Sequence, residues 1–106
     1  MNSTAQITKE IKQTVLSIDP TAEVILFGSR ARGDFHEESD WDVLVLTEGN
    51  EVEIKLKQKQ IRNSLHDLEL HVSQVIFAMV YSHNFWESKL SGSPLYQEVI
   101  KDGKTL

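Results

Sequence analysis

Apolar residues recur along this chain with two different periods, and the change of period separates helices from strands. Near the N-terminus the spacing is helical, at Ile7, Ile11, Val15 and Ile18. This spacing predicts a first helix whose N-cap is Ser3 or Thr4, because a hydroxyl there accepts a hydrogen bond from a free backbone N–H. We expect the helix to end at Asp19-Pro20, since the residue before a proline avoids helical backbone angles.

Two short apolar stretches, residues 23–27 and 41–46, have the character of strands. The second stretch is apolar on both of its faces, which is typical of a central strand covered on both sides. Between the two strands, Gly28-Ser29 is expected to open a short helical segment that ends at Gly33 and leads into a polar, acidic loop.

The second half of the chain predicts one long helix, a long extended segment and two short helices. The expected order is a turn at Gly49-Asn50, a helix over residues 51–66, an extended stretch over 68–82, a helical turn at 84–89 and a helix at 95–101. The extended stretch is either one strand with a bulge near Ser73-Gln74 or two strands. The whole order predicts a single α/β (α+β) domain over residues 1–106, with a small mixed or antiparallel sheet of three to five strands flanked by helices.

Composition and charge limit the classes of function that fit this fold. The chain has 106 residues, 40% of them hydrophobic and 25% charged, which is ordinary for a globular domain. A net charge of -5 argues against general nucleic-acid binding, because that needs a basic face. The absence of cysteine and the polar N-terminus favour a cytoplasmic protein, and no apolar run is long enough to cross a membrane.

The candidate chemistry lies where the two strands and the turn between them meet. Asp40 and Asp42 point to the same side of the chain, because successive side chains of a strand alternate between faces. Two carboxylates on one face can hold two Mg²⁺ ions, which stabilise the attacking and leaving oxygens of nucleotide transfer. Gly28 and Ser29 are suited to contact phosphates through backbone N–H groups and a hydroxyl, and Arg30 or Arg32 could neutralise the leaving pyrophosphate.

The run Gly28-Ser29-Arg30-Ala31-Arg32-Gly33, followed by Ser39-Asp40-Trp41-Asp42-Val43-Leu44-Val45, resembles the signature of the DNA polymerase beta-like nucleotidyltransferase superfamily. Within it the chain is similar to the minimal nucleotidyltransferases, stand-alone domains of about this length. The resemblance implies ATP as substrate, Mg²⁺ as cofactor, Gly28 and Ser29 as phosphate contacts, and Asp40 and Asp42 as metal ligands. Many members pair with a separate HEPN protein as antitoxins that adenylylate the toxin, so a HEPN-type partner is expected here.

The superfamily usually adds a third carboxylate from a later strand, and this sequence offers two candidates for it. Glu69 is the first choice, as a catalytic and metal-binding residue in the alternating part of the extended stretch, and Asp67 is the second. The leading hypothesis is therefore a Mg²⁺-dependent enzyme that transfers AMP from ATP to a hydroxyl, such as a tyrosine, of a HEPN toxin. The alternatives are a non-catalytic antitoxin that acts by contact alone and an antibiotic-type enzyme that modifies a small molecule.

Overall fold

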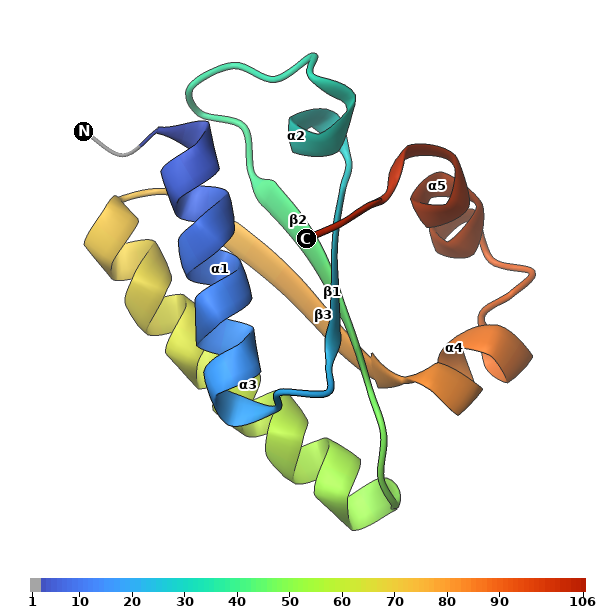
Figure 1. Ribbon diagram of the computed structural model, residues 1–106. Coiled ribbons are helices and arrows are strands. Elements are labelled where there is room, and N and C mark those ends of the chain that lie inside the picture. Colours follow the sequence, from blue (N-terminus) through green and yellow to red (C-terminus); the bar gives the residue numbers. More distant parts are fainter. Residues whose placement is uncertain (1–2) are drawn as a thin grey trace.

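The computed structural model describes residues 3–106, and within them four strands form one mixed sheet flanked by five helices (Figure 1). Met1 and Asn2, which the single-domain prediction includes, lie outside the described residues. In chain order the elements are α1 (Thr4–Ile18), β1 (Glu23–Phe27), α2 (Ser29–Arg32), β2 (Trp41–Thr47), α3 (Glu51–Val72), β3 (Ile76–Ser82), α4 (His83–Lys89), α5 (Pro94–Asp102) and β4 (Lys104–Thr105).

The strands are arranged in the order β3-β2-β1-β4. β1 runs antiparallel to both β2 and β4, whereas β2 and β3 are parallel, because the long helix α3 carries the chain back to the start of the sheet. The expected mixed sheet flanked by helices is therefore confirmed.

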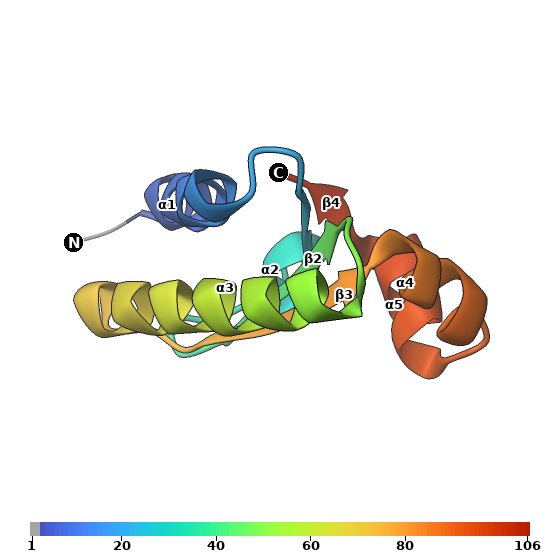
Figure 2. The ribbon, with the colours of Figure 1, turned by 90° about the horizontal axis from the view of Figure 1, so that it is seen from below.

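Helices cover both faces of the sheet, as the apolar character of residues 41–46 predicted. Figure 2 shows the sheet nearly edge-on, with α1 and α3 on one side and α4 and α5 on the other. Trp41, Val43 and Val45 pack in the cluster under α1 and α3, and Leu44 and Leu46 pack against α4 and α5. Alternate residues of β2 thus serve two cores, which explains why only Asp42 and Thr47 of this strand are polar.

The helix α3 is longer than predicted and takes in residues that the sequence had suggested were strand. It continues to Val72 and ends at Ser73, which has a left-handed φ of 58°. Leu68 and Val72 extend the apolar stripe of Ile61 and Leu65 at helical spacing and pack in the same core cluster. The prediction of a strand from residue 68 was wrong, because this spacing also satisfies the alternation of a strand over a few residues.

A short C-terminal strand, β4, was not predicted from the sequence. It pairs with β1 through Ile25↔Thr105 and Leu26↔Lys104, and the backbone N–H of Leu106 donates to the carbonyl of Val24 at 2.8 Å. The two residues carry no apolar pattern of their own, and β1 supplies the pairing partner. β4 fastens the preceding helix α5 beside the end of β1.

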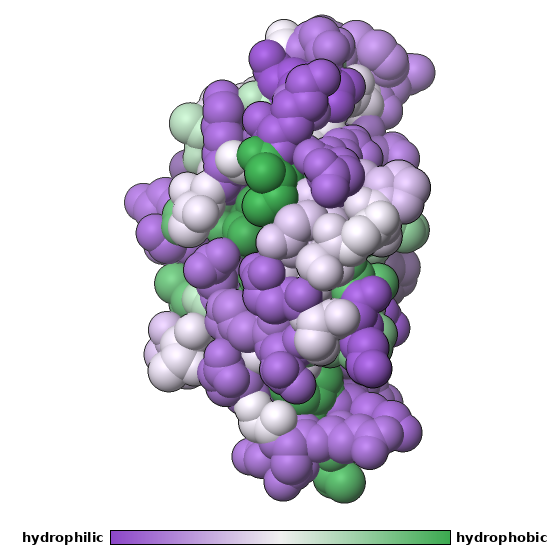
Figure 3. All heavy atoms as spheres, turned by 90° about the vertical axis from the view of Figure 1, so that its right-hand side faces the viewer, coloured by the Kyte–Doolittle hydropathy of each residue, from purple (hydrophilic) through white to green (hydrophobic). Residues whose placement is uncertain are grey.

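Seen from the side of α4 and α5, the surface is mainly hydrophilic, with hydrophobic residues in small separate areas (Figure 3). Across residues 3–106, none of the helices combines the length and the apolar character that a membrane span needs.

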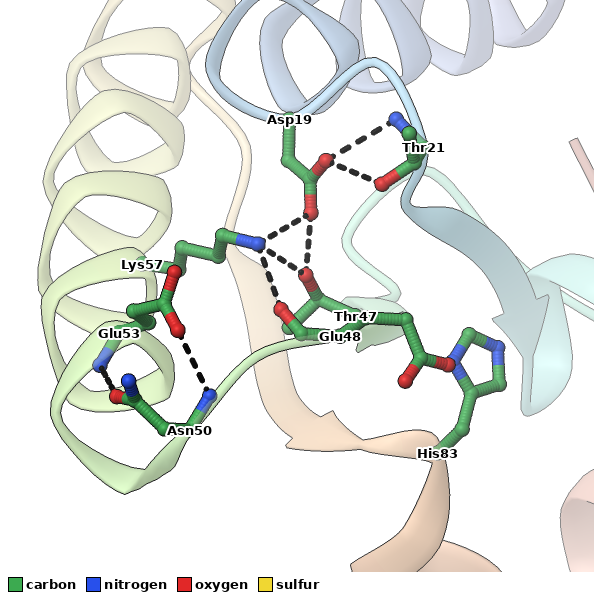
Figure 4. A network of polar contacts seen from close by, with 8 residues as sticks. All are labelled: Asp19, Thr21, Thr47, Glu48, Asn50, Glu53, Lys57 and His83. Atoms are coloured by element: carbon green, nitrogen blue, oxygen red, sulfur yellow. Dashed lines mark hydrogen bonds and ion pairs between the residues drawn. The ribbon is translucent and has the colours of Figure 1, made fainter.

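A buried polar network fastens the end of the sheet that lies away from α2 (Figure 4). Asp19, only 5% exposed, follows α1 and accepts hydrogen bonds from the hydroxyl of Thr47 and from the N–H and hydroxyl of Thr21. The Nζ of Lys57 lies 3.2 Å from the Asp19 carboxylate and also donates to the carbonyl of Glu48 at 2.7 Å. The network joins α1, β2 and α3 at one point.

The charge of Asp19 is strongly favoured in the folded state. Burial alone would raise the pKa of its carboxyl, but the hydrogen bonds from Thr47, Thr21 and Lys57 outweigh burial and hold this pKa well below 3.8. A carboxyl whose pKa is depressed by folding stabilises the protein above its unfolded pKa, and this contribution is lost as the pH falls below that value.

We expect Asp19→Asn to lower the free energy of unfolding by about 2–4 kcal/mol at pH 7, because it leaves Lys57 without its buried carboxylate. Urea unfolding followed by circular dichroism measures this loss, with Glu23→Gln, an exposed acid on β1, as the control. The difference between Asp19→Asn and wild type should narrow as the pH falls below about 3.8. A loss below about 0.5 kcal/mol, within the usual range of surface substitutions, would show that the network is not the fastening point.

Candidate functional site

The turn after β1 lies directly against one of the two predicted metal-binding carboxylates. β1 and β2 pair with Phe27 opposite Asp42, so the next residue, Gly28, approaches the Asp42 side chain. Gly28 has φ 73° and ψ -160°, a combination that only glycine adopts readily. A Cβ at this position would lie 3.2 Å from the Asp42 Cγ and closer still to one carboxylate oxygen. Glycine is therefore required here for both backbone angle and space.

Asp40 and Asp42 form an acidic pair at the start of β2, at the end of the sheet where α2 lies (Figure 1). Asp42 is partly buried and Asp40 is exposed. Burial raises the pKa of the Asp42 carboxyl, and the negative charges of Asp40 and Glu98 raise it further. The guanidinium of Arg32 acts in the opposite direction. A cation bound beside these acids would relieve the repulsion between them.

The residues of this pair fit magnesium, and the turn beside them fits phosphate. Carboxylate oxygens are the ligands that Mg²⁺ takes from proteins, with its other positions left to water and substrate phosphates. Helix geometry gives the backbone N–H groups of Ser29 and Arg30 no acceptor within the short helix α2, whereas those of Ala31 and Arg32 donate to the carbonyl of Gly28. The hydroxyl of Ser29 lies in the same turn. Asp40 and Asp42 could thus hold a metal ion while the Gly28-Ser29 turn binds the phosphates that share it.

Of the two arginines expected at the site, Arg32 lies on the side of Asp42. Its Nε donates to Asp34 at 3.2 Å, and its Nη1 donates to Asp102 of α5 at 3.4 Å. The Oε1 of Glu98 lies 3.9 Å from the same Nη1. The hydrogen bonds to Asp34 and Asp102 raise the pKa of Arg32. Its guanidinium, which is always cationic, lies close enough to Asp42 to lower the pKa of that carboxyl.

Arg30, the other arginine expected to contact the nucleotide, lies apart from Asp42. It is 7% exposed, and its guanidinium lies 4.5 Å from the ring centres of both Phe35 and Trp41, on the face of β2 opposite to Asp42. It donates to the carbonyl of Ser39 at 3.1 and 3.2 Å and to the side chain of Gln74 at 3.2 Å. Arg30 therefore anchors the loop that leads to Asp40, through hydrogen bonds from its Nε and Nη2.

Glu69, the first choice for the third carboxylate, does not lie with the acidic pair. It lies in α3, where its Oε2 accepts from the backbone N–H of Ile76 at 2.7 Å and its Oε1 lies 3.2 Å from His66 Nδ1. Asp67, the second choice, is an exposed residue of the same helix. Within residues 3–106 no three His, Cys, Asp or Glu side chains come close enough together to hold a metal ion. Glu69 instead caps the start of the edge strand β3.

The residue beside Asp42 on the neighbouring strand is Phe77, which the sequence analysis did not single out. The parallel register pairs Asp42 with Phe77, and the phenyl ring is 57% exposed at the edge of the sheet. Phe77 also lines a groove of about 340 Å³ that runs along β3 to His66 and Arg62 of α3. Only the strand register, which no sequence pattern revealed, identifies it as a neighbour of the site.

Asp102 is a second residue that the sequence analysis did not identify. It pairs with Arg32, although the two residues are far apart in the sequence. No short-range motif links the two residues. The signal lies in the fold, since β4 places the end of α5 beside the turn that follows β1.

Comparison with known proteins gives consistent similarities over most of the chain. The family model described as the nucleotidyltransferase domain matches residues 8–102. A candidate protein adenylyltransferase of Methanocaldococcus jannaschii, MJ0141, is 49% identical over 59 residues, which are 54% of this chain and 59% of that protein. A second one from the same organism, MJ0604, is 35% identical over 85 residues, or 79% of this chain and 76% of that protein. The matched part thus spans under two thirds of MJ0141.

A solved structure supports the same fold. A toxin–antitoxin protein crystallised with AMP-PNP superposes with a TM-score of 0.63 at 20% identity, over 92% of this chain and 69% of that chain. At this level of identity the likeness concerns the arrangement of helices and strands.

We expect Gly28→Ala to cost about 3 kcal/mol of stability and to displace the Asp42 carboxylate, because the added methyl is both strained and obstructed. Gly33→Ala is the matched control, since Gly33 has φ 91° but an added Cβ there meets no atom within 4 Å. That variant should cost only about 1–2 kcal/mol. Gly92→Ala, with neither constraint, should cost less than either. Equal urea midpoints for the Gly28 and Gly33 variants would contradict the close approach of Gly28 to Asp42.

Proposed function

Because the chain belongs to the nucleotidyltransferase domain family, we propose that it transfers AMP from ATP to a hydroxyl group of a protein, with Mg²⁺ bound by Asp40 and Asp42. The observation that carries this proposal is the β1–β2 register, which sets the Gly28 turn against the Asp42 carboxylate. A metal–nucleotide site needs a turn that can bind phosphate and, in contact with it, carboxylates that can bind a hard cation such as Mg²⁺.

The residues divide the work of the transfer between them. Ser29 and the N–H groups of its turn hold the outer phosphates, and Arg32 neutralises the charge that develops on the pyrophosphate. The acceptor oxygen attacks the α-phosphorus, the bond to the bridging oxygen breaks, pyrophosphate leaves and the hydroxyl proton passes to solvent. Magnesium, when bound, neutralises the phosphates and polarises the α-phosphorus. Gly28 leaves the room that this approach needs.

The acceptor that fits best is a protein side chain, and we take it to be a tyrosine or another hydroxyl residue of a separate HEPN-type toxin in the cytoplasm. Three exposed apolar residues, Leu70, Val75 and Phe77, lie at the end of α3 and β3 nearest to Asp42. Exposed apolar residues grouped beside a site are typical of protein–protein contact. The M. jannaschii relatives named for protein adenylylation and the toxin–antitoxin with AMP-PNP support the same class of acceptor.

A second candidate function is neutralisation of the partner by contact alone, with nucleotide bound and no transfer. The observation that favours it is the lack of a third acid close enough to join the Asp40–Asp42 pair among residues 3–106. The two functions differ in whether neutralisation of the partner depends on the two aspartates.

The test is to incubate the protein with Mg²⁺ and a HEPN-type protein from the same genome, using ATP labelled at the α-phosphate and, in parallel, at the γ-phosphate. We expect α-label on the partner and no γ-label, because AMP is transferred and pyrophosphate leaves. Asp42→Asn should lower the rate at least a hundredfold, since removing one preorganised electrostatic group costs about 10²–10³ in rate. Chelation of Mg²⁺ should abolish the transfer.

Glu69→Gln is the control that tests whether Glu69 is a catalytic residue, as the sequence suggested, or a structural one, as its contacts indicate. Its side chain caps Ile76, so the rate should change less than threefold. A Glu69→Gln enzyme as impaired as Asp42→Asn would restore Glu69 as a catalytic group. If the partner carries no label and is still neutralised by both wild type and Asp42→Asn, only the contact mechanism remains.

A further inference from the structure

The helix α5 contributes a carboxylate, that of Asp102, which contacts Arg32 beside the turn expected to bind phosphate. Arg32 is the last residue of the four-residue helix α2 and is followed by Gly33 in a left-handed conformation, so its backbone alone constrains the side chain little. Arg30 is clamped between two aromatic rings, whereas the Arg32 side chain is 39% exposed. The position of the Arg32 guanidinium therefore depends on its acidic partners.

Among those partners Asp102 is the most firmly held. Its side chain is 15% exposed, compared with 63% for Asp34 and 45% for Glu98. The next residue, Gly103, lies against the Val99 carbonyl and the side chain of Ile25, so an added Cβ there would clash. Pairing of β4 with β1 then ties this corner to the strand that leads into Gly28. Asp102 and the phosphate turn thus share one rigid frame.

The contacts leave part of the guanidinium free for a ligand. Asp34 uses the Nε of Arg32, and both acids of α5 use Nη1. Throughout residues 3–106, no hydrogen bond or ion pair involves Nη2 of Arg32. An arginine carries five N–H donors in a fixed fork, so fixing two of its nitrogens orients the third.

We propose that Asp102 is a positioning residue that holds Arg32 with its Nη2 directed at the β- and γ-phosphates of the nucleotide. The proposal rests on the function proposed above and adds the C-terminal α5–β4 segment to the nucleotide site. It also makes a prediction of unusual sign. A carboxylate near a triphosphate repels it, so simple electrostatics predicts tighter ATP binding when Asp102 is removed. If Asp102 instead positions Arg32, the removal of Asp102 weakens ATP binding.

The test compares the binding of ATP and AMP to wild type and variants by calorimetry in Mg²⁺, because the two ligands differ only in the β- and γ-phosphates. We expect Asp102→Ala to weaken ATP binding about tenfold and to leave AMP binding unchanged. Asp102→Glu, which keeps the charge, should recover part of the loss. Gln97→Ala, an exposed residue of the same helix, is the control and should behave as wild type.

A double-mutant cycle with Arg32→Ala separates positioning from an independent effect. If Asp102 acts through Arg32, Asp102→Ala adds nothing to the loss already caused by Arg32→Ala. Additive losses, unchanged ATP binding or tighter ATP binding in Asp102→Ala would each overturn the proposal. Circular dichroism of each variant checks the fold, and Asp102→Asn, which has the same shape as the native residue, replaces Asp102→Ala if the latter is unfolded.

The outcome distinguishes this inference from the proposed function. Wild-type ATP binding that requires Mg²⁺ and Asp42, together with an Asp102→Ala variant that matches wild type, overturns the positioning role alone. No Mg²⁺-dependent ATP binding by wild type overturns both.

Discussion

The antiparallel pairing of Phe27 with Asp42 is the constraint on which the rest of the site depends. It brings a glycine with φ 73° against a carboxylate, and no other residue type fits that position. A shift of the register by one residue would turn Asp42 to the other face of the sheet and exchange the two apolar cores of β2. The burial of Trp41 on one side and Leu44 on the other therefore fixes the site as firmly as it fixes the fold.

The two ends of this sheet use polar residues in opposite ways. At one end, Asp19 is buried among donors that favour its charge, so the network stabilises the fold. At the other, Asp42 is partly buried beside further acids that disfavour its charge, which is a cost carried by the metal-free protein. The strands on both sides hold this carboxylate in place, and the proposed cation would supply the positive partner that it lacks. Arg30 and Arg32, two residues apart, show the same division between scaffold and site.

The local features of the candidate site could be predicted from the sequence. A turn between two apolar strands and a pair of aspartates one residue apart are short-range patterns, and in the structure the Gly28-Ser29 turn lies against Asp42, with Asp40 nearby. The misplacement of Glu69 came from Leu68 and Val72, whose spacing suits a strand over a few residues and a helix over many. Asp102, Phe77 and the role of Arg30 depend on strand register and on β4 pairing, and contacts between distant residues leave no periodic signal.

The most direct test of the central claim is paramagnetic broadening in the NMR spectrum of the amide groups, with Mn²⁺ in place of Mg²⁺ and AMP-PNP as the nucleotide. A metal–nucleotide site at the β1–β2 turn predicts that residues 28–30 and 40–43 broaden first, that nucleotide strengthens the effect, and that Asp40→Asn/Asp42→Asn removes it. Broadening centred on α3 near Glu69, or spread evenly over the acidic surface with no dependence on nucleotide, would contradict a metal–nucleotide site at the β1–β2 turn.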